Sequence, residues 1–179
     1  VRDSKVTTAN GDAGLFGRGE WATENATYPN GCHICEVEID VDTGALEIVT
    51  YALVDDFGNV INPLLLAGQI HGGIAQGAGQ ALMEVAAYDG SGQLVTGSFM
   101  DYAMPRASDF PFFEIETNPV PSPRNPLGIK GAGEAGTVGA VACLTSAILD
   151  ALAPPGIEEL AMPAMPERVW RAIQDAAGG

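Results

Sequence analysis

Glycine is the residue type that most constrains how this chain can fold, because its 23 glycines gather in clusters rather than spread evenly over 179 residues. One cluster lies at residues 68–79 and the other at residues 128–139. The first lies inside a run that otherwise has the pattern of a helix, although each interior glycine costs a helix about 1 kcal/mol relative to alanine. A helix that keeps so many glycines must gain from close packing, or from a ligand that approaches its backbone.

The rest of the pattern predicts a mixture of strands and helices. Two runs with alternating apolar residues, 34–40 and 46–54, flank a short turn at residues 42–44 and predict a β-hairpin. Periodicity and stop signals predict the other elements: helices at 64–87, 137–152 and 166–177, and strands at 94–104 and 112–117. We therefore expect an α+β fold in which helices pack on an antiparallel sheet.

The length of the chain favours one domain with a real hydrophobic core. Residues 1–31 are polar and glycine-rich and have no sustained period, so we expect an extended arm that packs on something else. Residues 32–179 carry the periodic elements and are expected to form the α+β body. The prediction is a single domain over residues 1–179, made of this arm and this body.

The charge balance excludes several classes of partner. The net charge is −15, with 8 basic against 23 acidic residues. Nucleic acid and anionic membrane surfaces both need clustered cations, so neither is expected as a partner. No uninterrupted apolar stretch reaches about 18 residues, so no membrane span is expected. The odd count of three cysteines, together with a start that lacks a signal-peptide pattern, indicates a reducing compartment, the cytoplasm.

The sharpest chemical feature is the loop at residues 130–136, which leads into an apolar helix. Its glycines let backbone N–H groups approach a ligand, and the N-terminus of a helix favours an anion. The loop nevertheless contains an acidic residue, Glu134. A carboxylate in an apolar, glycine-walled site can serve as a base. The alternative is a glutamate that only complements the helix dipole.

The same loop matches the G-x-G-x-x-G pattern through Gly131, Gly133 and Gly136, which raises the alternative of a nucleotide-binding enzyme. The dinucleotide fingerprint needs a buried strand before the loop and an acidic residue about 20 positions later, at the end of a second strand. Here the preceding residues are proline-rich, and the acidic residue downstream, Asp150, lies inside the predicted helix. The context therefore disfavours a dinucleotide fold.

Two further motifs carry weaker signals. Cys32 and Cys35 form C-x-x-C, but a zinc site needs a second pair of ligands and a redox pair belongs at the start of a helix. Since this pair enters a strand, we expect neither zinc nor redox chemistry there. His71 lies among the glycines of the first cluster, and it either faces a ligand or is a hydrogen-bonded, partly buried side chain.

Five segments, in this order, are similar to one known family: PNGCHICEVEIDVDTG, DDFGNVINPLLLAGQIHGGIAQGAGQAL, GSFMDYAMPRA, PSPRNPLGIKGAGEAGTVG and MPERVWRAI. They resemble the C-terminal part of the molybdopterin-binding large subunit of the molybdenum hydroxylases, which include xanthine dehydrogenase, aldehyde oxidase and the carbon monoxide dehydrogenase large chain. The similarity covers most of residues 29–172. Because earlier portions of the family's subunit have no counterpart here, we expect one lobe of the molybdenum-cofactor-binding domain.

The resemblance implies a cofactor and a reaction. The cofactor is molybdopterin with molybdenum, often as the cytosine dinucleotide in bacterial members, while iron–sulfur and FAD groups are expected on partner subunits. The reaction hydroxylates an aldehyde or N-heterocycle carbon with water-derived oxygen, or oxidises carbon monoxide. By the family's motifs, Glu134 is the catalytic base. The cofactor-binding residues that the motifs imply are Gln69, Lys130, Gly131, Ala132 and Gly133, the last four through their backbone.

The resemblance also implies partners: the remaining part of the large subunit, the iron–sulfur and FAD subunits, and a small-molecule substrate. No side chain of this chain is expected to bind the metal. The family's cofactor lies between lobes, so the chain is expected to be inactive alone. The rival interpretation is a non-catalytic assembly or binding module that keeps the fold without the cofactor. The presence of both Glu134 and Gln69 favours the catalytic origin.

Overall fold

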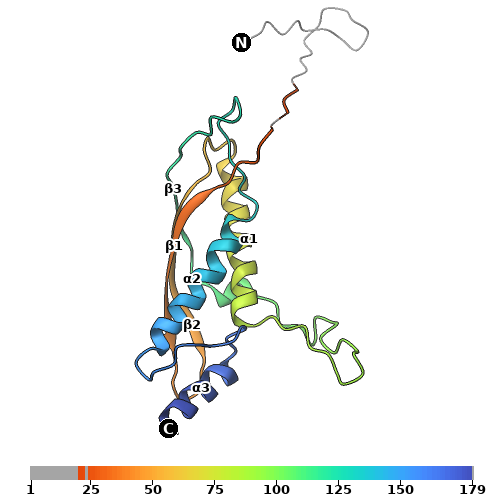
Figure 1. The fold of residues 1–179 in the computed structure, drawn as a ribbon, viewed down its shortest axis with the longest axis vertical. Helices are drawn as coiled ribbons and strands as arrows, with labels where there is room; N and C mark the ends of the chain where they lie inside the picture. Colours follow the sequence, from red (N-terminus) through yellow and green to blue (C-terminus); the bar gives the residue numbers. More distant parts are fainter. Residues whose placement is uncertain (1–19, 23, 179) are drawn as a thin grey trace, which may run out of the picture.

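The computed structural model describes residues 20–22 and 24–178 (Figure 1). The elements follow one another as β1 (Asn30–Ile39), β2 (Leu46–Asp56), α1 (Pro63–Leu82), the 3₁₀ helix η1 (Ala107–Asp109), β3 (Glu114–Thr117), α2 (Ala135–Leu152) and α3 (Pro166–Gly178). The strands form one sheet in the order β1-β2-β3, and α1 and α2 pack on each other against it. This arrangement of a sheet with packed helices confirms the predicted α+β class.

The sheet is mixed rather than antiparallel throughout. β1 and β2 form the predicted antiparallel hairpin, with Cys35 opposite Tyr51. β3 pairs with β2 in parallel, with Ala52 opposite Glu114. The chain reaches β3 only after α1 and a long connection, and a strand that returns by such a crossover can join in parallel.

The hairpin turn is fixed by its own residues. The Asp40 carboxylate accepts hydrogen bonds from the N–H groups of Asp42 and Thr43, at 2.9 and 3.2 Å. Gly44 has a φ of 72°, and a Cβ there would lie 2.6 Å from the backbone nitrogen of Trp170 in α3. Both the backbone conformation and the close approach of α3 therefore require a glycine at this turn.

Two buried clusters hold the layers together. The larger one joins β2, α1 and α2 through side chains such as Tyr51, Ile70 and Leu144. The smaller one joins the end of α2 to α3 through Leu152 and Val169. From His33 to Ile39 every second residue of β1 is partly buried, which confirms an alternating strand, although Ile34 lies on the exposed face.

Four of the five glycines of α1 divide into two groups. Gly73 and Gly77 are buried against α2, where a Cβ on Gly73 would lie 3.0 Å from the Cα of Gly136. Close packing therefore explains this part of the cluster. Gly68 and Gly72 are exposed, and a Cβ on either would meet no described atom within 4 Å. Packing among the described residues gives no reason for these two glycines.

The bounds of the three α-helices agree with the sequence-based prediction except at the C-terminal end of α1. α1 stops at Leu82 rather than near residue 87, because the N–H groups of Met83 and Glu84 both donate to the Gly79 carbonyl. The bounds of α2 and α3 lie within two residues of the prediction. Apolar runs bounded by proline or glycine thus predicted helix position well.

The predicted strand at residues 94–104 is wrong. Residues 83–106 form an irregular segment that projects from the body at the end of α1 (Figure 1). Turns hold its backbone, since the N–H groups of Asp101 and Tyr102 both donate to the Ser98 carbonyl. Phe99 and Met100 are 87% and 92% exposed, so the apolar residues that suggested a strand are not buried against the described residues.

Most of the predicted arm lies outside the described residues, which begin at residue 20. Residues 24–29 are irregular, and β1 begins at Asn30, inside the range that the prediction assigned to the arm.

α2 has the length and apolar composition of a membrane-crossing helix, with 18 residues and a mean hydropathy of 1.6. Its fully buried residues recur every four positions, at Gly136, Ala140, Leu144, Ile148 and Leu152. This spacing turns one face of α2 towards α1 and β1. A core helix passes the same length and composition test as a membrane helix, so α2 by itself does not indicate a span.

Candidate functional site

The loop before α2 is anchored at its start to the end of β2. The Lys130 N–H donates to the Phe57 carbonyl at 2.9 Å, and the Lys130 ammonium pairs with the Asp56 carboxylate. Asp56 also accepts hydrogen bonds from the N–H groups of Val120 and Gly58. The pKa of Asp56 is lowered to about 2, mainly by the hydrogen bond from Lys130 and, to a smaller extent, by the one from Val120. Lys130 therefore holds the loop in place through both its side chain and its N–H.

Beyond Lys130 the backbone of the loop is open. Gly131 and Gly133 are exposed and Ala132 is half-buried, and no described residue accepts a hydrogen bond from their N–H groups. A Cβ on Gly133 would meet no described atom within 4 Å, so packing within the described chain does not require a glycine there. Three consecutive free N–H groups in such a loop suit a ligand that approaches the backbone closely.

Glu134 is the N-cap residue of α2. Its carbonyl accepts the Val138 N–H at 3.0 Å, and its side chain makes no capping hydrogen bond. The residue is exposed, so the described residues do not supply the apolar, glycine-walled surroundings that we expected for a base. Those surroundings require a further covering element, either a cofactor or another part of the protein.

Gln69 lies on the turn of α1 that packs against the start of α2. Its neighbour Ile70 is buried, and the Ile70 carbonyl oxygen would lie 2.6 Å from a Cβ on Gly136, two residues after Glu134. Gln69 itself is exposed. The structure therefore brings the predicted glutamine, the glycine loop and the predicted base to one end of the α1–α2 pair.

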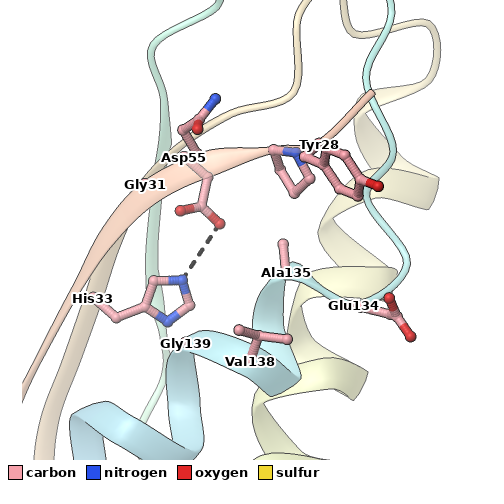
Figure 2. A pocket seen from close by; sticks show the side chains of 10 residues that line it. Tyr28, Gly31, His33, Asp55, Glu134, Ala135, Val138 and Gly139 are labelled. Carbon is pink, nitrogen blue, oxygen red and sulfur yellow. Dashed lines mark hydrogen bonds and ion pairs between the residues drawn. The ribbon is translucent and has the colours of Figure 1, made fainter. Parts of the chain in front are cut away.

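A pocket of about 290 Å³ lies between the start of β1 and the start of α2 (Figure 2). Its lining includes His33 and Asp55 from the sheet, and Glu134 and Val138 at the start of α2. Figure 2 shows His33 and Asp55 pointing towards each other, while the Glu134 carboxylate points away from them. The pocket thus has a buried polar pair on one side and the predicted base on the other.

His33 is a polar side chain that the sequence analysis did not select. Its ring nitrogens lie 2.7 Å from the Tyr51 hydroxyl oxygen and 3.4 Å from Asp55 Oδ2. The side chains of His33 and Asp55 are only 7% and 3% exposed. Burial raises the pKa of Asp55, and the nearby His33 opposes this shift. The sequence feature that could have indicated a buried His33 is the alternation of β1, which places His33 on the same inward face as Cys35.

His71 has the features of the second possibility that the sequence left open. Its Nδ1–H donates to the Ala67 carbonyl at 2.7 Å. Its ring packs near Phe112 and Phe113, with centroid distances of 6.1 and 5.4 Å. His71 is therefore a hydrogen-bonded, partly buried side chain.

The cysteines of the C-x-x-C motif point to opposite faces of β1. Cys32 is exposed, whereas Cys35 is turned inward and donates to the Cys143 carbonyl at 3.5 Å. Burial raises the pKa of Cys35 to about 12. Within the described part of the chain, no three metal-binding side chains gather in one place. That this pair binds no zinc stays a prediction, which the opposite orientation of the side chains supports.

Comparison with known proteins identifies the family. The sequence profile of the molybdopterin cofactor-binding domain matches residues 5–111, which is more than half of the chain. The carbon monoxide dehydrogenase large chain of Hydrogenophaga pseudoflava is 38% identical over 151 residues, which are 84% of this chain and 19% of the relative. The nicotine 6-hydroxylase large subunit of Paenarthrobacter nicotinovorans is 41% identical over 172 residues, which are 96% of this chain and 21% of the relative.

Solved structures show the same fold. The Cu,Mo-CO dehydrogenase in its carbon monoxide reduced state matches 94% of this chain and 21% of its own, with a TM-score of 0.87 and 35% identity. Quinoline 2-oxidoreductase from Pseudomonas putida 86 matches 82% of this chain and 19% of its own, with a TM-score of 0.78 and 45% identity. This chain spans about a fifth of the length of these relatives. Profile, relatives and fold agree that the chain belongs to the molybdopterin cofactor-binding domain family of the molybdenum hydroxylase large subunits.

Proposed function

We propose that this chain is the C-terminal, molybdopterin-binding portion of a molybdenum hydroxylase large subunit, in which Glu134 is the general base. The reaction hydroxylates an aldehyde or N-heterocycle carbon with water-derived oxygen, or oxidises carbon monoxide. The observation that carries this proposal is the meeting of three features at one end of the α1–α2 pair. They are Glu134, the turn that bears Gln69, and the open N–H groups of residues 131–133.

The residues at this end fit a large anionic cofactor that accepts and donates hydrogen bonds. The N–H groups of Gly131, Ala132 and Gly133 can donate to it, and the start of α2 favours its negative charge. The exposed amide of Gln69 offers both a donor and an acceptor. No side chain would have to bind the metal, because the pterin would hold it. When bound, the cofactor supplies two-electron redox chemistry, for which we propose iron–sulfur and FAD partners as electron acceptors.

The surroundings of Glu134 support its proposed role in moving a proton. No described residue makes a hydrogen bond with its carboxylate, so both oxygens are available to a ligand at this end of the helix pair. The remaining part of the large subunit and the cofactor would cover the carboxylate. A covered carboxylate accepts and holds a proton more readily than one in water, which is what a general base requires.

The named relatives support a small-molecule substrate. The chain is 41% identical to the subunit named for nicotine and 45% identical to the enzyme named for quinoline, against 38% for the carbon monoxide dehydrogenase chain. We therefore place an N-heterocycle carbon first among the proposed substrate classes. The proposed compartment is the cytoplasm, where the electron-accepting subunits would assemble with the large subunit.

The test is Glu134→Gln in the complete, cofactor-loaded enzyme. The amide keeps the size of the side chain but cannot accept the proton, so kcat should fall by ~10²–10⁴. Molybdenum and pterin content should stay unchanged, because the backbone contacts are intact. The acidic limb of the pH–kcat profile should disappear with the base.

Glu167→Gln is the matched control, because Glu167 lies in the first turn of α3 and pairs with Arg171 on the surface. A surface pair contributes less than about 1 kcal/mol to stability, so this variant should keep its kcat. If Glu134 only complemented the helix dipole, its loss would cost ~0.3–1 kcal/mol of stability and little activity. A fully loaded Glu134→Gln enzyme with wild-type kcat would remove Glu134 as the base.

A further inference from the structure

The backbone of α2, rather than the side chain of Glu134, sets where Glu134 lies. Its side chain makes no capping hydrogen bond, and its carboxylate has no hydrogen-bond partner among the described residues. The position of Glu134 therefore depends on how residues 135–139 are seated against their neighbours.

On one side, this start of α2 is fixed by α1. Gly136 lies so close to α1 that a Cβ there would be 2.6 Å from the Ile70 carbonyl oxygen and 3.0 Å from the Cα of Gly73. The Thr137 hydroxyl donates to the Gly73 carbonyl at 3.0 Å. These contacts fix α2 against α1 but do not set its distance from the sheet.

On the other side, the start of α2 rests on the ring of His33. A Cβ on Gly139 would lie 2.5 Å from His33 Nδ1 and 2.7 Å from Nε2, so only a glycine leaves room for the ring. Figure 2 shows the ring reaching from β1 towards this part of α2, beside the pocket that Glu134 also lines. The His33 ring thus acts as a spacer between the sheet and the helix.

The ring is itself held in place by β2. It contacts the Tyr51 hydroxyl at 2.7 Å and Asp55 Oδ2 at 3.4 Å, and it packs edge-on against the Tyr51 ring. If the ring moved away, a buried carboxylate and a buried hydroxyl would lose this partner, which is costly. The spacer is therefore rigid.

Successive inward residues of β1 meet α2 about one turn further along. His33 contacts α2 at Gly139. Cys35, two residues later in β1, donates to the carbonyl of Cys143, which is four residues after Gly139 in α2. Two strand residues advance about 6.6 Å and four helix residues about 6 Å, so strand and helix stay in step. The chain thus contains a matched pair: His33 is the contact nearer to Glu134, and Cys35 is the next contact away from it.

From this geometry we propose that His33 is a positioning residue, which sets the depth of the start of α2 and through it the position of Glu134. The inference rests on the proposed role of Glu134 as the base. His33 acts through the helix backbone, with Gly139 as the contact point and with Tyr51 and Asp55 as its supports.

The experiment uses the complete, cofactor-loaded enzyme with Gly139→Ala, which displaces the ring, and His33→Ala, which removes it. A misplacement of about 1 Å can cost 10²-fold in rate, so we expect kcat to fall by about 10- to 10²-fold in both variants. KM and molybdenum content should stay close to wild type. The acidic limb of the pH–kcat profile should shift, and the amides of residues 135–139 should exchange hydrogen faster. His33→Gln, which keeps a hydrogen-bonding group near the position of Nε2, should recover part of kcat.

Cys35→Ala is the control, because it removes the corresponding contact one turn further along α2 and should leave kcat and the acidic limb unchanged. Wild-type kcat and pH profile in Gly139→Ala would overturn the proposal. The proposal would also be overturned if all His33 variants lost molybdenum while Cys35→Ala kept it. His33 would then be needed for assembly of the loaded enzyme rather than for positioning Glu134. Glu134→Gln is measured alongside. If it keeps wild-type kcat, the proposed function fails; if it loses activity while the His33 and Gly139 variants do not, only this inference fails.

Discussion

Two glycine-to-alanine substitutions in α1 should change stability in opposite directions. In Gly72→Ala the new Cβ meets no described atom within 4 Å. In Gly77→Ala it would lie 2.8 Å from the Thr137 carbonyl oxygen and 2.9 Å from the Ala140 Cβ. Both positions are inside the helix, so both variants gain the same helix propensity, about 1 kcal/mol. The difference between them is therefore steric.

The magnitude follows from the distances. Ordinary van der Waals contact begins near 3.4 Å and the Thr137 oxygen lies at 2.8 Å, so the two helices must separate by 3.4 − 2.8 = 0.6 Å at this point. The obstacle is backbone, which cannot rotate away, and overpacking of this kind costs ~1–3 kcal/mol. We expect Gly72→Ala to stabilise the chain by ~0.5–1 kcal/mol, and Gly77→Ala to range from neutral to about 2 kcal/mol destabilising.

Urea unfolding of the isolated chain, followed by helical circular dichroism, measures this difference as a shift in midpoint at constant m. A Gly77→Ala chain as stable as the Gly72→Ala chain would refute the packing argument. The same variants separate packing from ligand contact in the complete enzyme. No described atom lies within 4 Å of a Cβ on Gly72, so packing among the described residues does not require a glycine there. If the cofactor or another part of the subunit approaches this exposed position closely, Gly72→Ala should lower molybdenum content while stabilising the isolated chain.

Three further predictions concern the isolated chain. It should fold without retaining molybdopterin, because Glu134 and the loop at 131–133 are open and a tight ligand needs most of its surface enclosed; pterin fluorescence in oxidised extracts of the purified chain would contradict this. Lys130→Met should flatten the pH dependence of stability between about pH 4 and pH 2. Because the pKa of Asp56 is lowered in the folded chain, its carboxylate stabilises the fold at pH values above its ordinary pKa of 3.8, and this stabilisation is lost as the pH falls towards 2. If the urea midpoint changes equally with pH in the variant and in the wild type, the result would count against the ion pair. Cys32→Ser with Cys35→Ser should leave metal content unchanged, and elemental analysis that finds stoichiometric zinc only in the wild type would refute this.

The parts of the fold that the sequence predicted well are those encoded by local pattern. The hairpin of β1 and β2 follows from alternation and from the turn at Gly44, and α2 and α3 follow from apolar runs with proline or glycine at their ends. The parallel pairing of β3 was missed because it depends on residues about 60 positions apart, such as Ala52 and Glu114. The false strand at residues 94–104 shows that apolar residues between a turn and a proline do not by themselves tell a buried strand from an exposed segment.

The candidate site was predictable where a motif marks it. Glu134 and Gln69 lie in motifs, and the structure brings their segments to one end of the helix pair. The role of His33 could not be read from the sequence, because its partners Tyr51 and Asp55 are 18 and 22 residues away. The exposure of Glu134 was equally hidden, because the burial of a side chain depends on distant residues that a local motif does not specify.

The strand order places β1 at one edge of the sheet, and no described residue pairs with its outer side. Such an edge offers a row of unpaired N–H and C=O groups to any extended chain, and it is a common starting point for aggregation. Glu36 and Glu38 place negative charge on the outward face of this strand. Because copies of the chain each carry a net charge of −15, they repel one another along this edge. The negative charge that disfavours nucleic-acid binding thus also disfavours pairing between the β1 strands of two copies of the chain.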